Sequence, residues 1–243
     1  MKRTVATLSC LLCAAVALSA EARAPACPGD MALIPSHGAS PAFCIDRYEA
    51  TTIELDARGR DTAPHSAFTP VAGKRVRAVS RAGAFPQAYI SRDEAETACK
   101  ASHKRLCSED EWVFACKGKV PTVYPYDDVA IDGYCNDNGK SPLGIVHGAD
   151  VEAAYASPVA MNDPQLNQLP GTLARSGSHT KCRNAFGVFD MVGNVHEWVA
   201  DKAGTFRGGY YLDVHKNGDG CNYRTTAHDA TYHDYSTGFR CCR

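Results

Sequence analysis

The chain has 243 residues, and its 26 basic and 27 acidic residues give a formal net charge of −1 at pH 7. The charges are spread without long runs of one sign, which argues against nucleic acid or an anionic membrane as a partner. The 20 glycines and 13 prolines divide the sequence into short segments, so we expect short strands and long loops. Together these features predict a loop-rich α+β fold.

The first residues are typical of an export signal. The basic start "MKR" is followed by the apolar run "TVATLSCLLCAAVALSA" and by small residues that suit a signal peptidase. The run is shorter than the roughly 20 apolar residues that a membrane-spanning helix needs. We therefore expect a signal peptide over residues 1–24 and one mature domain over residues 25–243. The mature protein is predicted to be secreted or periplasmic, monomeric and without a lipid anchor.

Cysteine is the most informative residue type. Twelve cysteines are present, and removal of the leader takes away Cys10 and Cys13. An even number of cysteines in an exported chain favours disulfides over metal–thiolate chemistry. No Cys-x-x-Cys pair occurs among the remaining ten, which argues against a zinc ribbon or a thioredoxin-like centre. We expect all ten to be paired; they are Cys27, Cys44, Cys99, Cys107, Cys116, Cys135, Cys182, Cys221, Cys241 and Cys242.

The sequence predicts few regular elements. The first strands are expected in "MALIP", residues 31–35, and "FCIDRYEAT", residues 43–51. In "SRDEAETACKASHK" the spacing of Ser91 and Glu94 is that of a capping box and predicts a helix over residues 92–103. "SEDEWVFACKG" repeats the pattern from its first serine and ends at its glycine, which predicts a second helix. A later short strand is expected in "TFRGGYYL".

Residues 184–201, "NAFGVFDMVGNVHEWVAD", contain a candidate ion-binding turn. Asp190 and Glu197 bracket Gly193 and Asn194, so a turn there can bring two carboxylates and the intervening carbonyls together. Calcium prefers such oxygen ligands. The alternative is a helix cap at Asp190, a glycine turn and an exposed Glu197, and the spacing alone leaves both open. No EF-hand loop competes, because "DDVAIDG" lacks the oxygen ligand at its third position.

The loop "YLDVHKNGDGCNYR", residues 211–224, brings two carboxylates, an imidazole and a thiol close together: Asp213, His215, Asp219 and Cys221. One interpretation is a metal site formed by Asp213, His215 and Cys221, with His228 or His233 as a further ligand. The other interpretation is a surface loop tied down by a disulfide.

Several segments occur in the order and spacing of a known family. They are "KRLCSEDEWVFACKG", "NAFGVFDMVGNVHEWVAD", "FRGGYY" and the terminal "GFRCC", preceded by "FCIDRYEAT". In these motifs the chain resembles the sulfatase-modifying-factor family, which includes the formylglycine-generating enzymes. The resemblance covers about residues 30–243. It implies a compact, loop-rich α+β fold, distantly similar to C-type lectin domains.

For calcium, the resemblance implies a specific set of ligands. The side chains of Asp190 and Glu197 and the carbonyl oxygens of Gly193 and Val195 match the family's calcium-binding positions. All four positions supply oxygen in this sequence, so calcium is the expected cofactor. The resemblance also implies a second calcium site near Asn136 in "CNDN".

For copper, the sequence departs from the family. The enzymes follow an "RGGS" segment with two nearby cysteines that bind copper as thiolates and oxidise a substrate cysteine with molecular oxygen. Here Asp213 stands in the position of the first cysteine, and Cys221 matches the second only after a short insertion. A carboxylate binds copper(I) weakly, so the two-thiolate site is broken. Asp213 and Cys221 are therefore weak candidates for catalysis, and copper is a weaker candidate cofactor than calcium.

The resemblance also implies disulfides. It implies a bridge between Cys99 and Cys241, and a partner for Cys116 at a position that corresponds to the neighbourhood of Thr226. Cys116 thus lacks its usual partner, and Cys221 or Cys242 can take that place. A cross-linked loop is then the favoured interpretation of residues 211–224.

Two functions remain open. The first is an exported oxidase of the formylglycine-generating kind, which modifies a cysteine or another side chain of a partner protein in the cleft lined by residues 207–224. The second is a non-catalytic secreted module, stabilised by calcium and disulfides, that binds a protein or a glycan. No Gly-x-Ser-x-Gly elbow or Walker-type loop supports other chemistry. Iron chemistry of the ergothioneine-type sulfoxide synthases is not expected, because the chain has no room for the helical domain that carries their histidines.

Overall fold

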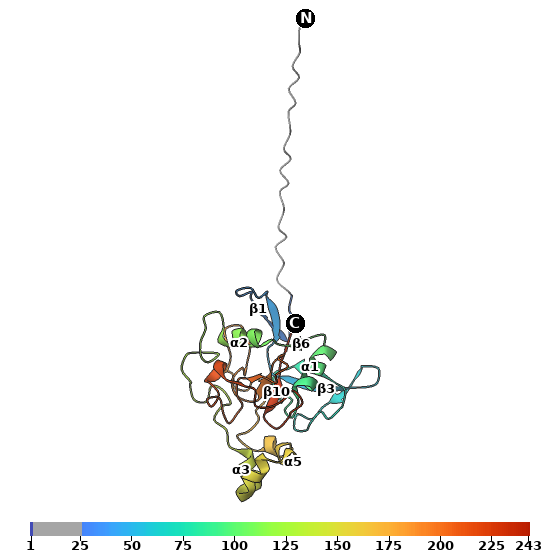
Figure 1. The fold of residues 1–243 in the computed structure, drawn as a ribbon, viewed down its shortest axis with the longest axis vertical. Coiled ribbons are helices and arrows are strands. Elements are labelled where there is room, and N and C mark those ends of the chain that lie inside the picture. Colours follow the sequence, from blue (N-terminus) through green and yellow to red (C-terminus); the bar gives the residue numbers. More distant parts are fainter. Residues whose placement is uncertain (2–25) are drawn as a thin grey trace.

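The computed structural model describes residue 1 and residues 26–243 (Figure 1). The predicted signal peptide, with Cys10 and Cys13, lies outside the described residues apart from Met1. Among the described helices, none combines the length and the apolar character that a bilayer crossing requires.

Three small sheets form the body of the protein, as the many glycine and proline breaks predict. The first has the order β1 (Met31–Ile34), β2 (Phe43–Asp46), β11 (Cys241–Cys242) and β6 (Arg105–Leu106). The second has the order β10 (Thr237–Phe239), β7 (His196–Trp198), β8 (Phe206–Arg207) and β9 (Arg224–Thr225). The third has the order β4 (Asp61–Pro64), β3 (Ala50–Leu55) and β5 (Val76–Ser80). The short strands and the mixed α+β composition confirm the predicted fold class.

Two capped helices pack beside the sheets. Helix α1 (Arg92–Ala101) begins at Ser91 and helix α2 (Glu109–Lys117) begins at Ser108, and both caps are complete capping boxes. In each box the serine side chain accepts a hydrogen bond from the third helical residue, whose glutamate accepts one from the serine backbone. Both predicted helices are thereby confirmed, although α1 ends two residues earlier than expected, since His103 adopts a positive φ of 56°.

A further helical segment protrudes from the body (Figure 1). It contains α3 (Pro142–His147), η1 (Gly148–Asp150), α4 (Val151–Tyr155) and α5 (Pro158–Met161), and the turns η2 (Leu166–Gln168) and η3 (Gly220–Asn222) occur later in the chain. The sequence analysis did not anticipate these short helices. Ser141 caps α3 and Ser157 caps α5, and each is followed by a proline at the first helical position, which was a usable signal.

Five disulfides connect the elements, and they pair all ten cysteines of residues 26–243 as predicted. They are Cys27–Cys44, Cys99–Cys241, Cys107–Cys242, Cys116–Cys221 and Cys135–Cys182. The bridge that the resemblance implied between α1 and β11 is confirmed, and the partner of Cys116 is Cys221 rather than Cys242. Such a density of disulfides indicates an oxidising compartment.

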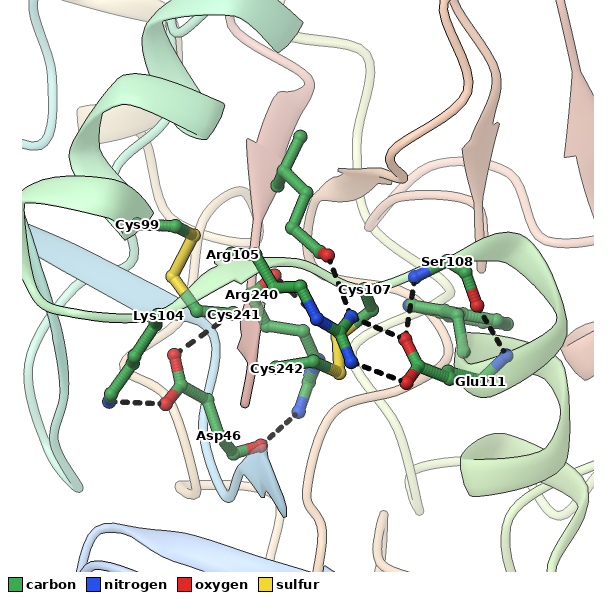
Figure 2. Close-up of a disulfide and its surroundings, with 12 residues drawn as sticks. Asp46, Cys99, Lys104, Arg105, Cys107, Ser108, Glu111, Arg240, Cys241 and Cys242 are labelled. Atoms are coloured by element: carbon green, nitrogen blue, oxygen red, sulfur yellow. Dashed lines mark hydrogen bonds and ion pairs between the residues drawn. A yellow bond between two sulfur atoms is a disulfide. The ribbon is translucent and has the colours of Figure 1, made fainter. Parts of the chain in front are cut away.

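Strand β11 is bridged on both of its faces (Figure 2). Successive side chains of a strand point to opposite sides, so Cys241 bonds to Cys99 of α1 while Cys242 bonds to Cys107, directly before α2. This arrangement joins both principal helices to one strand at the centre of the first sheet.

Candidate functional site

Residues 211–224 form a cross-linked loop between β8 and β9. Cys221 lies in the turn η3, is fully buried, and bonds to Cys116 of α2 with a Cα–Cα distance of 5.7 Å. Because its sulfur is part of a disulfide, Cys221 offers no thiolate to a metal. The interpretation of this segment as a cross-linked loop is confirmed, and the alternative metal site loses its sulfur ligand.

The polar side chains of this loop stabilise the loop itself. The Asp213 Oδ1 atom accepts hydrogen bonds from the backbone nitrogens of His215 and Lys216, at 3.0 and 2.9 Å, as in an Asx turn. His215 Nδ1 lies 2.8 Å from Asp219 Oδ1, and both side chains are exposed to solvent. Within residues 26–243, no group of three or more His, Cys, Asp or Glu side chains is arranged to hold a metal ion. Asp213 therefore acts here as a turn-forming residue.

The two other candidate histidines are engaged elsewhere. His228 stacks on Tyr232 with ring centroids 3.6 Å apart, and burial lowers the pKa of His228. His233 Nδ1 lies 2.7 Å from Asn162 Oδ1 in the segment after α5. Neither histidine forms a metal-binding group with the loop in the described part of the chain.

The turn at residues 190–197 is buried rather than exposed. Asp190 and Asn194 adopt positive φ values of 55° and 60°, and Gly193 has a φ of 80°. A Cβ atom at Gly193 would lie 2.3 Å from the carbonyl oxygen of Asn136, so only glycine fits there. The alternative of an exposed Glu197 is wrong, because this residue is only 1% exposed.

The four predicted calcium ligands differ in their availability. No hydrogen bond to the carbonyl oxygens of Gly193 and Val195 is found among the described residues, which fits ion coordination. Glu197 is already engaged, since the guanidinium of Arg240 binds both of its oxygens and Trp112 Nε1 donates to Oε2 at 2.7 Å. Calcium at this turn stays a prediction, and it requires Glu197 to share its oxygens with Arg240.

The surroundings of this turn are rich in buried carboxylates. Asp190 Oδ2 accepts a hydrogen bond from the backbone nitrogen of Gly177 at 2.6 Å, yet burial raises the pKa of Asp190 to about 7. Glu49 binds Ser176 and Asn194 through Oε2, while its buried Oε1 has no hydrogen-bond partner in the described residues. Burial holds the pKa of Glu49 well above its usual value. Sequence reasoning missed Glu49, whose place after β2 gives no local hint of this neighbourhood.

Asn136 has a structural position beside the same turn. Its carbonyl oxygen accepts a hydrogen bond from Asn194 at 2.8 Å, and its amide donates to Thr172 and to Asn194 Oδ1, both at 2.9 Å. The second calcium site near Asn136 stays a prediction.

A pocket of about 490 Å³ opens beside the cross-linked loop. We call it the aromatic pocket; its principal lining residues are Tyr155, His196, Phe206, Tyr210, Asp213, Lys216, Tyr223, His228, Tyr232, Asp234 and Tyr235. Strands β7, β8 and β9 supply one part of it, and the segment that leads into β10 supplies another. It occupies the cleft that the sequence analysis assigned to residues 207–224.

His196 is the most unusual residue of the aromatic pocket. Its ring stacks on Phe206 and on Tyr223, with centroid distances of 4.5 and 5.3 Å, and lies 4.7 Å from the ring of Tyr210. The Nδ1 atom is buried without a hydrogen-bond partner among the described residues. Burial lowers the pKa of His196 to about 3, so the imidazole is neutral near pH 7. Sequence reasoning missed it, although a histidine beside the apolar residues of "NVHEWV" was the available signal.

The charged groups of the pocket are mostly acidic. The Tyr223 hydroxyl donates a hydrogen bond to Asp213 Oδ2 at 3.3 Å. Asp234 accepts hydrogen bonds from the Tyr232 hydroxyl at 2.6 Å and from Ser236 at 2.7 Å. Lys216 is the one lysine or arginine among the described lining residues. Aromatic faces and two carboxylates therefore define the character of this site.

Comparison with known proteins identifies relatives along most of the chain. The sulfatase-modifying factor enzyme 1-like domain model matches residues 25–243. The inactive C-alpha-formylglycine-generating enzyme 2 of Bos taurus is 28% identical over 169 residues, which are 65% of this chain and 50% of that protein. The Mus musculus protein of the same name is 28% identical over 169 residues, which are 65% of this chain and 48% of that protein. The chain thus spans about half the length of the curated relatives it matches.

Solved structures resemble the fold. CarF superposes with a TM-score of 0.51 at 18% sequence identity, over 84% of this chain and 86% of that chain. PvdO from Pseudomonas aeruginosa gives a TM-score of 0.47 at 18% identity, over 84% of this chain and 81% of that chain. At this identity the likeness to CarF shows the fold alone. Because the family model matches residues 25–243, the family predicted from the motifs is confirmed, and the chain belongs to the sulfatase-modifying factor enzyme 1-like domain family.

Proposed function

We propose that this chain is an exported binding module that has lost the copper-dependent oxidation of its family, and that the aromatic pocket is its ligand site. The Cys116–Cys221 disulfide carries this proposal. Copper(I) chemistry needs thiolate ligands, but Asp213 supplies oxygen and the sulfur of Cys221 is bonded to another cysteine. All ten cysteines of the described residues are paired, so no other thiolate replaces it.

The relatives support the same proposal. Both mammalian proteins that match the chain are named as inactive formylglycine-generating enzymes. An inactive member of the family therefore has a precedent at 28% identity.

The chemistry of the pocket favours an organic cation as the ligand, such as the guanidinium or ammonium group of a partner protein's arginine or lysine. Aromatic faces attract cations through their quadrupole, with a free energy of roughly 0.5–2 kcal/mol per contact. Tyr155 and Tyr210 provide such faces, and Asp213 and Asp234 add negative charge. His196 adds no positive charge that would repel a cation, because its imidazole is neutral near pH 7.

An oxidation assay tests the loss of catalysis. Purified protein is incubated with copper, oxygen, reductant and a Cys-x-Pro-x-Arg peptide, and the mass of the peptide cysteine is followed. We expect no formylglycine, and we expect alkylation of the unreduced native protein to label no cysteine. Multiple turnover that disappears in Cys221→Ser would contradict the proposal and restore the oxidase as the function.

A titration tests the ligand site. Agmatine, which carries a guanidinium and an ammonium group, and cadaverine, which carries two ammonium groups, are titrated into the native protein by calorimetry, with neutral N,N′-diacetylcadaverine as the control. Tyr210→Leu removes a ring from the pocket, whereas the matched Tyr210→Phe keeps the aromatic face. Binding of the cations that survives in Tyr210→Phe and is lost in Tyr210→Leu is expected. Equal binding of the neutral control would overturn the cation assignment.

A further inference from the structure

A second and larger cleft shares no lining residue with the aromatic pocket. Its volume is about 770 Å³, within the range of ligand-binding sites. We call it the basic cleft; its principal lining residues are Lys117, Lys119, Thr122, Tyr126, Tyr134, Thr180, Lys181, Arg183 and Asn184. The segment after α2 forms one wall, and residues 180–185 form the other.

The basic cleft concentrates positive charge without compensation. Lys117, Lys119, Lys181 and Arg183 all line it, and no acidic residue does so among the described residues. None of these four side chains takes part in an ion pair in residues 26–243. The chain as a whole has a net charge of −1, so the cluster does not follow from composition. Four like charges at one concave site repel one another and attract an anionic ligand.

Two tyrosines give the basic cleft an aromatic floor. The rings of Tyr126 and Tyr134 lie 4.9 Å apart at 60°, and the Tyr126 hydroxyl accepts a hydrogen bond from the backbone of Ile131 at 3.1 Å. The ammonium of Lys181 lies over the Tyr134 ring, 4.6 Å from its centre, so a sugar ring reaches this face only when Lys181 turns away toward an anionic group of the ligand. Tyrosine presents a broad apolar face next to a polar hydroxyl, and such a face fits the C–H side of a sugar ring.

The walls of the basic cleft are held in place before any ligand binds. The Cys135–Cys182 disulfide joins the residue after Tyr134 to the residue between Lys181 and Arg183. Asn184 donates a hydrogen bond from its side chain to the backbone carbonyl of Ala115 in α2, which ties the second wall to the first. A preorganised site loses less conformational entropy when it binds.

We propose that the basic cleft binds an anionic oligosaccharide, with its sulfate or carboxylate groups at the four cations and a sugar ring on the tyrosines. The aromatic floor favours a glycan over an acidic peptide, because a sugar ring can pack on the tyrosines while its anionic groups contact the four cations. The four cations lie in one cleft of a nearly neutral chain rather than along an extended basic surface, which argues against nucleic acid. This inference does not depend on the ligand of the aromatic pocket.

Calorimetry with a defined sulfated tetrasaccharide tests the proposal on the native protein. We expect binding that weakens at high salt, and little binding of the desulfated tetrasaccharide. Lys181→Glu combined with Arg183→Glu is expected to weaken binding by about tenfold or more. Lys140→Glu combined with Lys202→Glu changes the net charge by the same amount at exposed sites outside the cleft, and it is expected to leave binding nearly unchanged.

Two further measurements make the test specific. Tyr134→Leu is expected to weaken binding, whereas Tyr134→Phe retains it because the ring remains. Equal losses in the two double-charge variants would show non-specific attraction and overturn the site. An acidic peptide of the same charge that binds as tightly as the tetrasaccharide would overturn the glycan assignment.

Discussion

The guanidinium of Arg240 holds both carboxylate oxygens of Glu197, with N–O distances of 2.6 Å for each contact. The two side chains are 0% and 1% exposed, so this ion pair is completely enclosed. Arg240 also donates to the backbone carbonyls of Asp46 and Phe189, at 3.1 and 2.9 Å. Two motifs that are 43 residues apart, "NVHEW" and "GFRCC", therefore meet in the centre of the domain.

Removal of one partner of this ion pair is expected to destabilise the fold strongly. Arg240→Met leaves the Glu197 charge buried and unpaired, which costs about 3–5 kcal/mol of unfolding free energy. Arg60→Met is the matched control, because Arg60 pairs with Asp56 at the surface with 70% of its side chain exposed. The control is expected to lose about 0–1 kcal/mol. Guanidinium unfolding measures both, and equal losses would contradict the structural role given to Arg240.

Calcium is expected to raise the melting temperature if it binds at residues 190–197. A ligand that binds only the native state stabilises it by RT ln(1 + [L]/Kd). The shift on chelation is therefore compared in the wild type, in Glu197→Gln and in Asp110→Asn, which changes an exposed carboxylate. We expect the shift to shrink only in Glu197→Gln. No shift in the wild type, together with no calcium found by metal analysis, would contradict calcium binding at residues 190–197.

Asp46 gives the stability of the protein a specific pH dependence. Its carboxylate lies 2.6 Å from Lys104 Nζ and accepts a hydrogen bond from the backbone of Cys241 at 3.0 Å (Figure 2). Burial nevertheless raises the pKa of Asp46 to about 6, so the folded state binds more protons than the unfolded state between about pH 4 and pH 6. Its contribution is complete at low pH and is lost as the pH rises through 6.

Asp46→Asn is the variant that isolates this effect. As the pH rises from 4 to 7, the wild type is expected to lose about 2 kcal/mol of unfolding free energy relative to Asp46→Asn. Asp56→Asn provides the surface control, since Asp56 is a partly exposed carboxylate bound to Arg60. A difference between wild type and Asp46→Asn that stays constant with pH would show that Asp46 titrates normally.

The two bridges of β11 are expected to be non-additive. Cys99–Cys241 and Cys107–Cys242 span 142 and 135 residues, but either bridge shortens the unfolded loop that the other closes to about ten residues. Loss of one pair to alanine is then expected to cost about 3 kcal/mol, and loss of both about 7 kcal/mol, because Cys116–Cys221 limits the remaining loop to about 40 residues. The separate bridge Cys27–Cys44 serves as the additive control. Equal and independent losses at all three bridges would contradict this loop model.

Local features of the sequence were predictable, and distant contacts were not. The capping boxes at Ser91 and Ser108 lie within four residues each, so the sequence alone located α1 and α2. The Cys99–Cys241 bridge was accessible only through the family resemblance, because spacing carries no information on pairing across 142 residues. The environment of Glu197 could not be predicted for the same reason, since Arg240 reaches it only through the parallel pairing of β10 with β7.

The candidate sites follow the same division. The loss of the two-thiolate site was visible at Asp213, which stands where the family has a cysteine. The aromatic pocket was visible only in part: a cleft was predicted along residues 207–224, but not the rings that β7, β8 and the segment before β10 contribute to it. The basic cleft brings together two walls that are far apart in sequence and that are connected through Cys135–Cys182.

The double bridging of β11 constrains the order in which the protein matures. Cys99 and Cys107 leave the ribosome, or a translocation channel, long before their partners at positions 241 and 242. During that interval their thiols are free to bond to Cys116 and other early cysteines, and only later exchange can correct such pairs. Oxidative folding of this chain is therefore expected to be accelerated by a thiol–disulfide isomerase, and expression without one is expected to yield mispaired species.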